Sequence, residues 1–151
     1  MFARKENGMF KTKVKAKDIM TKEVVIAKTD TPIYEAVRLL RKNEITGLPI
    51  VEDDMRLVGV LTEKDVLRLF YAEEDEKDKT AKDFMTRPAV SYKEDDTLQS
   101  ICDFMVINYF RRVPVTSKKG KVVGIISRPD VIDYILRTKG ESPDTVEKQS
   151  S

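Results

Sequence analysis

The sequence predicts an α+β protein built from two similar β-α-β-β-α units that follow one another along the chain. Three observations predict this class. The chain matches itself at a fixed offset, each copy alternates short apolar runs with helical periodicity, and 151 residues suit one compact domain or two small repeats. With 40% hydrophobic and 36% charged residues, the composition is that of a globular protein with a strongly ionised surface.

The duplication covers most of the chain. At an offset of 65, residues 17–70 align with 82–135 without a gap, and 13 of the 54 pairs are identical. Ordinary composition would give about three identities by chance. Such self-similarity at a fixed offset indicates a repeated structural unit. The identical pairs include Lys17/Lys82, Asp18/Asp83, Met20/Met85, Thr21/Thr86, Asn43/Asn108, Pro49/Pro114, Gly59/Gly124 and Asp65/Asp130.

Each copy has the same order of predicted elements. An apolar run predicts a first strand, and a helix follows, with Thr31 and Asp96 placed to cap it and Pro32 suited to its first position. Two strands joined by a short loop then predict a hairpin, and a second helix closes the copy. The predicted ranges are 24–26, 48–51, 57–61 and 63–70 in the first copy, and 89–92, 113–116, 122–126 and 130–137 in the second.

The boundaries of the repeats follow from charge and periodicity. The segment 71–81 is mostly charged and is expected to be a solvated linker. We therefore divide the chain into a flexible leader (1–13), repeat 1 (14–70), the linker (71–81), repeat 2 (82–137) and a flexible tail (138–151).

The two closing helices carry apolar residues around most of their circumference, whereas a surface helix needs only one apolar stripe. We expect the excess to be buried against the sister repeat or against a second chain.

The composition excludes several function classes. With one cysteine, Cys102, and no histidine, the chain can form neither an intrachain disulfide nor a Ser-His-Asp system nor a zinc site of His and Cys ligands. A net charge of +2 and the lack of a long apolar run argue against nucleic acid and membrane as partners. We expect a cytoplasmic protein with no metal and no catalytic residues. Asp53 and Asp54 could serve as acid/base groups or Mg²⁺ ligands, but exposed acids are ordinary in such a hairpin loop.

Three pairs of segments carry a resemblance to a known family: KAKDIMTKEVVIAK and TAKDFMTRPAVSYK, ITGLPIVEDD and FRRVPVTSKK, and LVGVLTEKDVL and VVGIISRPDVI. In order, spacing and duplication they resemble the cystathionine beta-synthase (CBS) domain family, whose tandem pairs are called Bateman modules. The resemblance covers about residues 14–137. It implies that the repeats pack through their sheets around a pseudo-two-fold axis and leave two clefts. It also implies that these clefts hold AMP, ADP, ATP or S-adenosylmethionine, and that the module dimerises through its helices.

The two strand-to-helix corners suit a sugar phosphate. Backbone N–H groups at a helix start lack partners, and the hydroxyl of Thr62 or Ser127 can donate to a phosphate oxygen. The carboxylate of Asp65 or Asp130 can accept both hydroxyls of a ribose, as the resemblance implies for these positions. The alternative is helix capping, because Thr-x-x-Asp and Ser-x-x-Asp also fit a capping pattern.

The resemblance assigns the remaining positions to two clefts, each combining one corner with the segment before the proline of the other repeat. The valines and methionines would flank adenine, or they are ordinary core. Because two arginines can contact phosphate, we expect cleft A to bind phosphorylated ligands more tightly, with strand alternation directing one of the two arginines into the cleft. Cleft A would contain Thr62, Asp65, Met85, Val90, Phe110, Arg111 and Arg112. Cleft B would contain Met20, Val25, Ile45, Thr46, Gly47, Ser127 and Asp130.

The function that follows is a stand-alone, non-catalytic regulatory module. It would bind an adenine nucleotide between its repeats, form a homodimer and signal to a partner protein in trans. The alternatives are an interaction protein whose clefts are empty and a sensor of S-adenosylmethionine.

Overall fold

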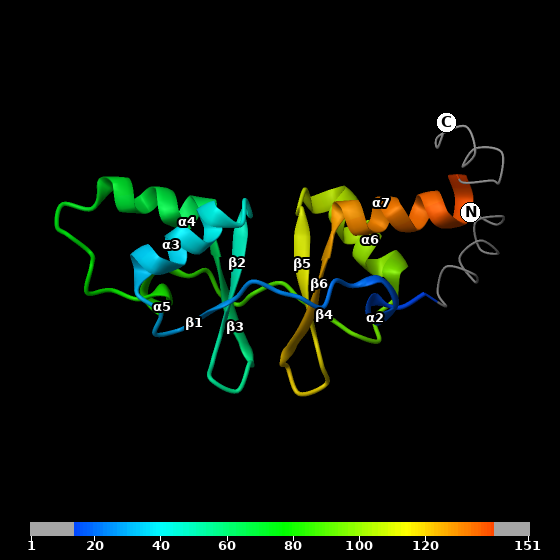
Figure 1. The fold of residues 1–151 in the computed structure, drawn as a ribbon, viewed down its shortest axis with the longest axis horizontal. Helices are drawn as coiled ribbons and strands as arrows, with labels where there is room; N and C mark the ends of the chain where they lie inside the picture. Colours follow the sequence, from blue (N-terminus) through cyan, green and yellow to red (C-terminus); the bar gives the residue numbers. More distant parts are fainter. Residues whose placement is uncertain (1–13, 141–151) are drawn as a thin grey trace.

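The computed structural model describes residues 14–140, so the predicted leader and the tail beyond residue 140 lie outside the described residues. The protein has two three-stranded sheets side by side, each with its own helices (Figure 1). Repeat 1 comprises α2 (Ala16–Ile19), β1 (Ala27–Lys28), α3 (Ile33–Lys42), β2 (Gly47–Val51), β3 (Leu57–Thr62), α4 (Glu63–Leu67) and the 3-10 helix η1 (Arg68–Tyr71). Repeat 2 comprises α5 (Ala81–Phe84), β4 (Tyr92–Lys93), α6 (Leu98–Asn108), β5 (Arg112–Thr116), β6 (Val122–Ser127), α7 (Arg128–Ile135) and the π-helical turn η2 (Leu136–Gly140).

The predicted α+β class is confirmed, and the two sheets have the same topology. Each contains one parallel pair followed by one antiparallel hairpin, in the order β1-β2-β3 and β4-β5-β6. Within residues 14–140, no helix has the length and apolar content needed to cross a membrane.

The first strand of each repeat lies later than predicted. The strands are Ala27–Lys28 and Tyr92–Lys93, whereas the apolar runs 24–26 and 89–91 form no strand. These runs belong to the segments that cross from one repeat to the other. They join no sheet and are only partly covered: Val25 is half-buried and packs on the core of repeat 1, whereas Val90 is exposed. An apolar run therefore marked a crossing segment and not the strand itself.

The helix caps were predicted one residue too early. The N-caps of α3 and α6 are Pro32 and Thr97, and the hydroxyl of Thr97 accepts from the backbone N–H of Ser100. Thr31 and Asp96 instead close the turn before the helix, since each side chain accepts from the backbone N–H three residues earlier, at 2.9 and 2.7 Å. The short helices α2 and α5 were not predicted.

The short helices α2 and α5 exchange places between the repeats. Ala16 of α2 is fully buried in the core of repeat 2, beside Ile101 and Ile126. Ala81 of α5 is fully buried in the core of repeat 1, beside Ile33 and Leu61. Figure 1 shows the chain crossing the molecule after each of these helices. The core of each repeat is therefore completed by a segment that the sequence alignment assigns to the other.

Surface contacts support this exchange. Lys17 of α2 lies 3.1 Å from Asp95 of repeat 2. The hydrogen bond and the charge of this contact raise the pKa of Lys17 and lower the pKa of Asp95. Both side chains are about half exposed, so the pair adds little to stability compared with the buried alanine.

Reciprocal hydrogen bonds between the hairpins mark the pseudo-two-fold axis. The N–H of Leu57 donates to the carbonyl of Gly120, and the N–H of Val122 donates to the carbonyl of Met55, both at 3.0 Å. These two bonds are related by the same offset of 65 that relates the sequences. The predicted packing of the repeats through their sheets is confirmed.

Gly59 and Gly124 allow the crossing segments to approach the sheets. A Cβ added at Gly59 would lie 2.7 Å from the backbone carbonyl oxygen of Thr86, which cannot move independently of the chain. At Gly124 it would meet mainly the side chain of Met20, which can rotate. We predict that Gly59→Ala lowers the free energy of unfolding by about 1–3 kcal/mol and that Gly124→Ala costs less, as measured by urea denaturation. Equal losses for the two variants would contradict this explanation.

The tips of the two hairpins carry residues with positive φ at corresponding positions of the repeats. Gly120 has φ +81° and its counterpart Met55 has φ +74°. A Cβ at Gly120 would meet only Arg56, at 3.7 Å, so the cost of Gly120→Ala is conformational. We predict a loss of about 1–2 kcal/mol for Gly120→Ala in denaturant unfolding. Met55→Ala should change stability by about 0.5 kcal/mol or less, because a side chain already occupies the left-handed region there.

Candidate functional site: a cleft between the repeats

A cavity of about 460 Å³ lies between the two repeats. Its walls come from three parts of the chain: the ends of β2 and β3, the segment before and into β5, and the crossing segment 86–90. The cavity therefore exists only because the repeats are packed against each other. The residues that line it are Thr46, Gly47, Pro49, Val60, Thr62, Glu63, Thr86, Pro88, Ala89, Val90, Tyr109, Phe110, Arg111, Arg112, Pro114 and Ile125.

The cavity contains most of the residues predicted for cleft A and two of those predicted for cleft B. The cleft A residues in its wall are Thr62, Val90, Phe110, Arg111 and Arg112. Thr46 and Gly47 were assigned to cleft B, yet they line the same space. They occupy the positions in repeat 1 that correspond to the two arginines in repeat 2, and the axis between the repeats brings both sets together.

The carboxylate of Asp65 lies beneath the corner and does not line the cavity. Asp65 is 1% exposed. Its carboxylate accepts from the N–H and the hydroxyl of Thr62, each at 2.9 Å, and from the hydroxyl of Thr86 at 2.9 Å. Arg68 is a further donor at 3.4 Å. These bonds form a capping box at the start of α4, which is the alternative that the sequence pattern left open.

The expectation of free backbone donors at the corners is wrong for the first and third residues of each helix. The N–H of Glu63 donates to the carbonyl of Thr46, and the N–H of Asp65 donates to the hydroxyl of Thr62. At the other corner, the N–H groups of Arg128 and Asp130 donate to Arg111 and Ser127 in the same way. These four N–H groups are therefore not free to bind a phosphate.

The second corner is capped in the same way but more loosely. The carboxylate of Asp130 accepts from the N–H of Ser127 at 2.9 Å and from the hydroxyl of Thr21 at 3.3–3.4 Å. Asp130 is half-buried. It does not line the 460 Å³ cavity, and neither does Ser127. The guanidinium of nearby Arg128 donates to the carbonyls of Phe110 and Met105, so it satisfies the end of α6.

Four of the remaining predicted residues are half-buried and pack against the cores. Met85 lies against Gly59 and the core of repeat 1, where Val25 and Ile45 also pack. Met20 packs in the same way against Gly124 and the core of repeat 2. Their sequence pattern fitted both core packing and adenine contact; the packing is seen here, and the adenine contact stays a prediction.

Two adjacent arginines give the cavity its positive charge. Arg111 and Arg112 both line it. The prediction that only one of them faces the cleft is wrong, because Arg111 precedes β5 and is not bound by strand alternation. The Nε of Arg112 is buried and has no hydrogen-bond partner among the described residues. A buried donor without a partner is costly, and a ligand that supplies an acceptor removes that cost.

Sequence reasoning missed Thr86 and Tyr109. Thr86 joins the crossing segment to Asp65, and its identity with Thr21 in the repeat alignment was the available signal. Tyr109 is 83% exposed at the mouth of the cavity, at φ +57° at the end of α6. No pattern in the sequence indicated this residue.

The fold, the duplicated corners and the cleft between them define a pair of CBS domains. Residues 16–72 and 81–137 each match the CBS domain family. The chain belongs to this family.

Comparison with individual proteins extends the match. The chain is 30% identical over 118 residues to inosine-5'-monophosphate dehydrogenase of Methanocaldococcus jannaschii, which is 78% of this chain but 23% of that enzyme. The structure resembles that of CBSX2 from Arabidopsis thaliana in complex with AMP (TM-score 0.74, 29% identity, 83% of this chain and 98% of the other). It also resembles the CBS pair of protein MJ0100 in complex with 5′-methylthioadenosine and S-adenosyl-L-methionine (TM-score 0.67, 29% identity, 83% and 98%).

The hydrogen bond from Thr86 to Asp65 can be tested by mutation, and the corresponding hydrogen bond from Thr21 to Asp130 serves as the control. Thr86→Val removes a donor from a buried carboxylate, so we predict a loss of about 1–3 kcal/mol in the free energy of unfolding. Thr21→Val affects a half-buried carboxylate with longer hydrogen bonds and should cost about 0.5 kcal/mol or less. Denaturant unfolding of both variants measures the difference, and equal effects would show that burial of Asp65 does not matter.

Proposed function

We propose that this CBS pair is a regulatory module that binds a phosphorylated adenine nucleotide (AMP, ADP or ATP) between its repeats without catalysing a reaction. The observation that carries the proposal is the unpartnered Nε of Arg112 in a cavity that Arg111 also lines. Phosphate oxygens are the acceptors that suit arginine best, because the planar guanidinium can donate two parallel bonds to them.

The cavity offers different surroundings to the two ends of such a ligand. Arg111 and Arg112 would hold the phosphates. The crossing segment supplies an apolar wall of Pro88, Ala89 and Val90, on which an adenine ring would lie. The AMP complex of CBSX2 supports this choice of ligand class.

The ribose contact remains a prediction. Thr62 lines the cavity. For Asp65 to accept the ribose hydroxyls, its carboxylate would have to exchange some of its present donors, such as Thr86. A second site at Ser127 and Asp130, and its weaker binding of phosphorylated ligands, remain predictions as well.

We propose that the signal is a change in how the repeats pack. A ligand that contacts both repeats stabilises the arrangement in which both sets of contacts form, and it shifts the population toward that arrangement. We further propose that the module is a homodimer in the cytoplasm and that a partner protein reads this shift in trans.

Binding is tested by isothermal titration calorimetry with AMP, ADP, ATP, adenosine and S-adenosylmethionine. We predict that the nucleotides bind more tightly than adenosine, because only they supply an acceptor for the arginines. Arg112→Ala should weaken AMP binding by about tenfold to a hundredfold while leaving adenosine binding unchanged. Arg41→Ala, an exposed arginine outside the cavity, is the matched control and should have no effect.

Two outcomes would contradict the proposal. The first is no binding, together with no increase in thermal stability for any adenosine compound, which would favour an interaction protein with empty clefts. The second is tighter binding of S-adenosylmethionine than of AMP, which would favour the ligand class seen in the MJ0100 complex.

A further inference from the structure

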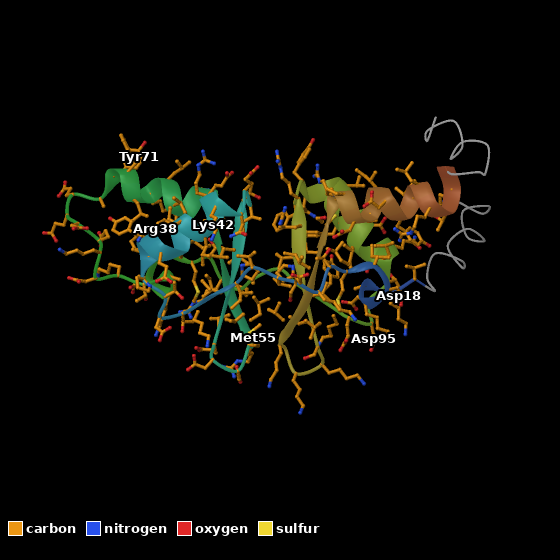
Figure 2. All side chains as sticks on the ribbon, viewed as in Figure 1. Asp18, Arg38, Lys42, Met55, Tyr71 and Asp95 are labelled. Atoms are coloured by element: carbon orange, nitrogen blue, oxygen red, sulfur yellow. The ribbon has the colours of Figure 1, made fainter. Side chains whose placement is uncertain are left out.

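The helices that close the two repeats leave apolar surface uncovered. Leu67 and Phe70 are 67% and 82% exposed, and Figure 2 shows the neighbouring Tyr71 pointing away from the molecule. The expectation that these helices bury their excess apolar residues against the sister repeat is therefore wrong within residues 14–140, and burial against a second chain stays a prediction. On repeat 2, part of the apolar surface of α7 forms one wall of a groove.

The groove has a volume of about 500 Å³ and lies between α6 and α7. Leu98 from α6 and Ile135 from α7 are among the apolar side chains of its wall. Val14, at which the described chain begins, belongs to the same wall. The predicted leader, residues 1–13, is therefore joined directly to the groove.

The leader reaches repeat 2 through the same backbone contact by which the linker reaches repeat 1. The N–H of Leu98 at the start of α6 donates to the carbonyl of Val14 at 2.8 Å. At the offset of 65, the N–H of Ile33 at the start of α3 donates to the carbonyl of Lys79 at 2.9 Å. An antiparallel bridge lies beside each of these bonds. The linker is therefore a guide to the position of the leader.

The linker crosses repeat 1 just before Lys79. There the N–H of Glu76 donates to the hydroxyl of Tyr34 on α3 at 3.4 Å. The counterpart of Tyr34 is Gln99, which lines the groove, and the counterpart of Glu76 is Lys11 of the leader. The chain thus covers repeat 1 at the position where repeat 2 has its groove, and the same symmetry directs the leader across that groove.

The leader has the side chains that an apolar groove binds. Where the linker carries Glu74 and Asp75, the leader carries Met9 and Phe10. Transfer of such apolar side chains from water into an apolar groove is favourable. Extended chain from Val14 to Phe10 spans up to about 14 Å, so the pair is held at a high effective concentration beside the groove.

The charges of the crossing segments and of the helices beneath them are reversed together. The linker carries Glu76, and α3 beneath it carries Arg38, which Figure 2 labels. The leader carries Lys11 at the matching position, and α6 carries Asp103 in the wall of the groove. In both repeats, the segment and the helix therefore have opposite charges at these positions, which favours their contact.

We propose that the leader folds back over repeat 2 of its own chain and places Met9 and Phe10 in the groove between α6 and α7, with Lys11 beside Asp103. The leader then covers repeat 2 as the linker covers repeat 1. This proposal departs from the expectation of a flexible leader. It depends neither on the nucleotide site nor on the homodimer.

Disulfide trapping tests the position of the leader. Cys102 lines the groove and is the only cysteine of the chain, so Phe10→Cys supplies a single possible partner. A disulfide forms without distortion only when the two Cα atoms come within about 7 Å. We expect oxidation with copper phenanthroline to join residues 10 and 102 within one chain, as shown by non-reducing electrophoresis and peptide mass spectrometry.

Phe2→Cys is the matched control for the trapping experiment. Residue 2 corresponds to Leu67 of α4 and not to the linker, so the symmetry gives it no place in the groove. Its disulfide with Cys102 should form about tenfold more slowly than that of Phe10→Cys. Equal rates for the two variants, or a disulfide that joins two chains in preference to one, would overturn the proposal.

The natural thiol gives a second answer that needs no added cysteine. If the leader covers the groove, Met9→Ser combined with Phe10→Ser should speed the reaction of Cys102 with N-ethylmaleimide by about fivefold to tenfold. Phe2→Ser should leave this rate unchanged. The same rate in the double variant as in the natural protein would contradict the proposal. Protection of Cys102 that increases with protein concentration would assign the groove to a second copy and overturn the proposal as well.

Discussion

The exchange of the two short helices between the repeats is the constraint on which the rest of the structure depends. Ala16 and Ala81 are fully buried, each in the core of the repeat to which its own sequence copy does not belong. A core that lacks this segment would have a hole and an exposed apolar surface, which is costly in a close-packed interior. The repeats are therefore held in one relative orientation, with the crossing segments between them.

The cavity is a consequence of that orientation. Neither repeat encloses it alone, because its walls combine the ends of β2 and β3, the start of β5 and the crossing segment 86–90. A ligand in it contacts both repeats at once. This geometry suits a sensor, since any change in how the repeats pack changes the cavity, and binding changes the packing in return.

The two copies keep the same or closely similar residues where the crossing segments pack on the sheets and where the corners are capped, and they differ at the cavity wall and on the outer faces. The glycines at 59 and 124 and the capping boxes at both corners have the same role in each copy. Thr46 and Gly47, by contrast, correspond to Arg111 and Arg112, so positive charge enters the cavity from one repeat only. The outer faces differ in the same manner, with arginine at 68 opposite in sign to aspartate at 133.

The sequence by itself determined the α+β class, the duplication, the hairpins and the arginine pair, because these depend on local periodicity, turn residues and charge. It misplaced the first strands and the caps by a few residues, since apolar runs such as 24–26 belong to a segment that crosses between the repeats and pair in no sheet. Only the tertiary structure decided that α2 and α5 exchange partners, that Asp65 is enclosed by its own capping box and by Thr86, and that Thr46 and Arg111 line one cavity. These features join residues far apart in the chain across a pseudo-two-fold axis, and a local sequence pattern carries no information about contacts made at that distance.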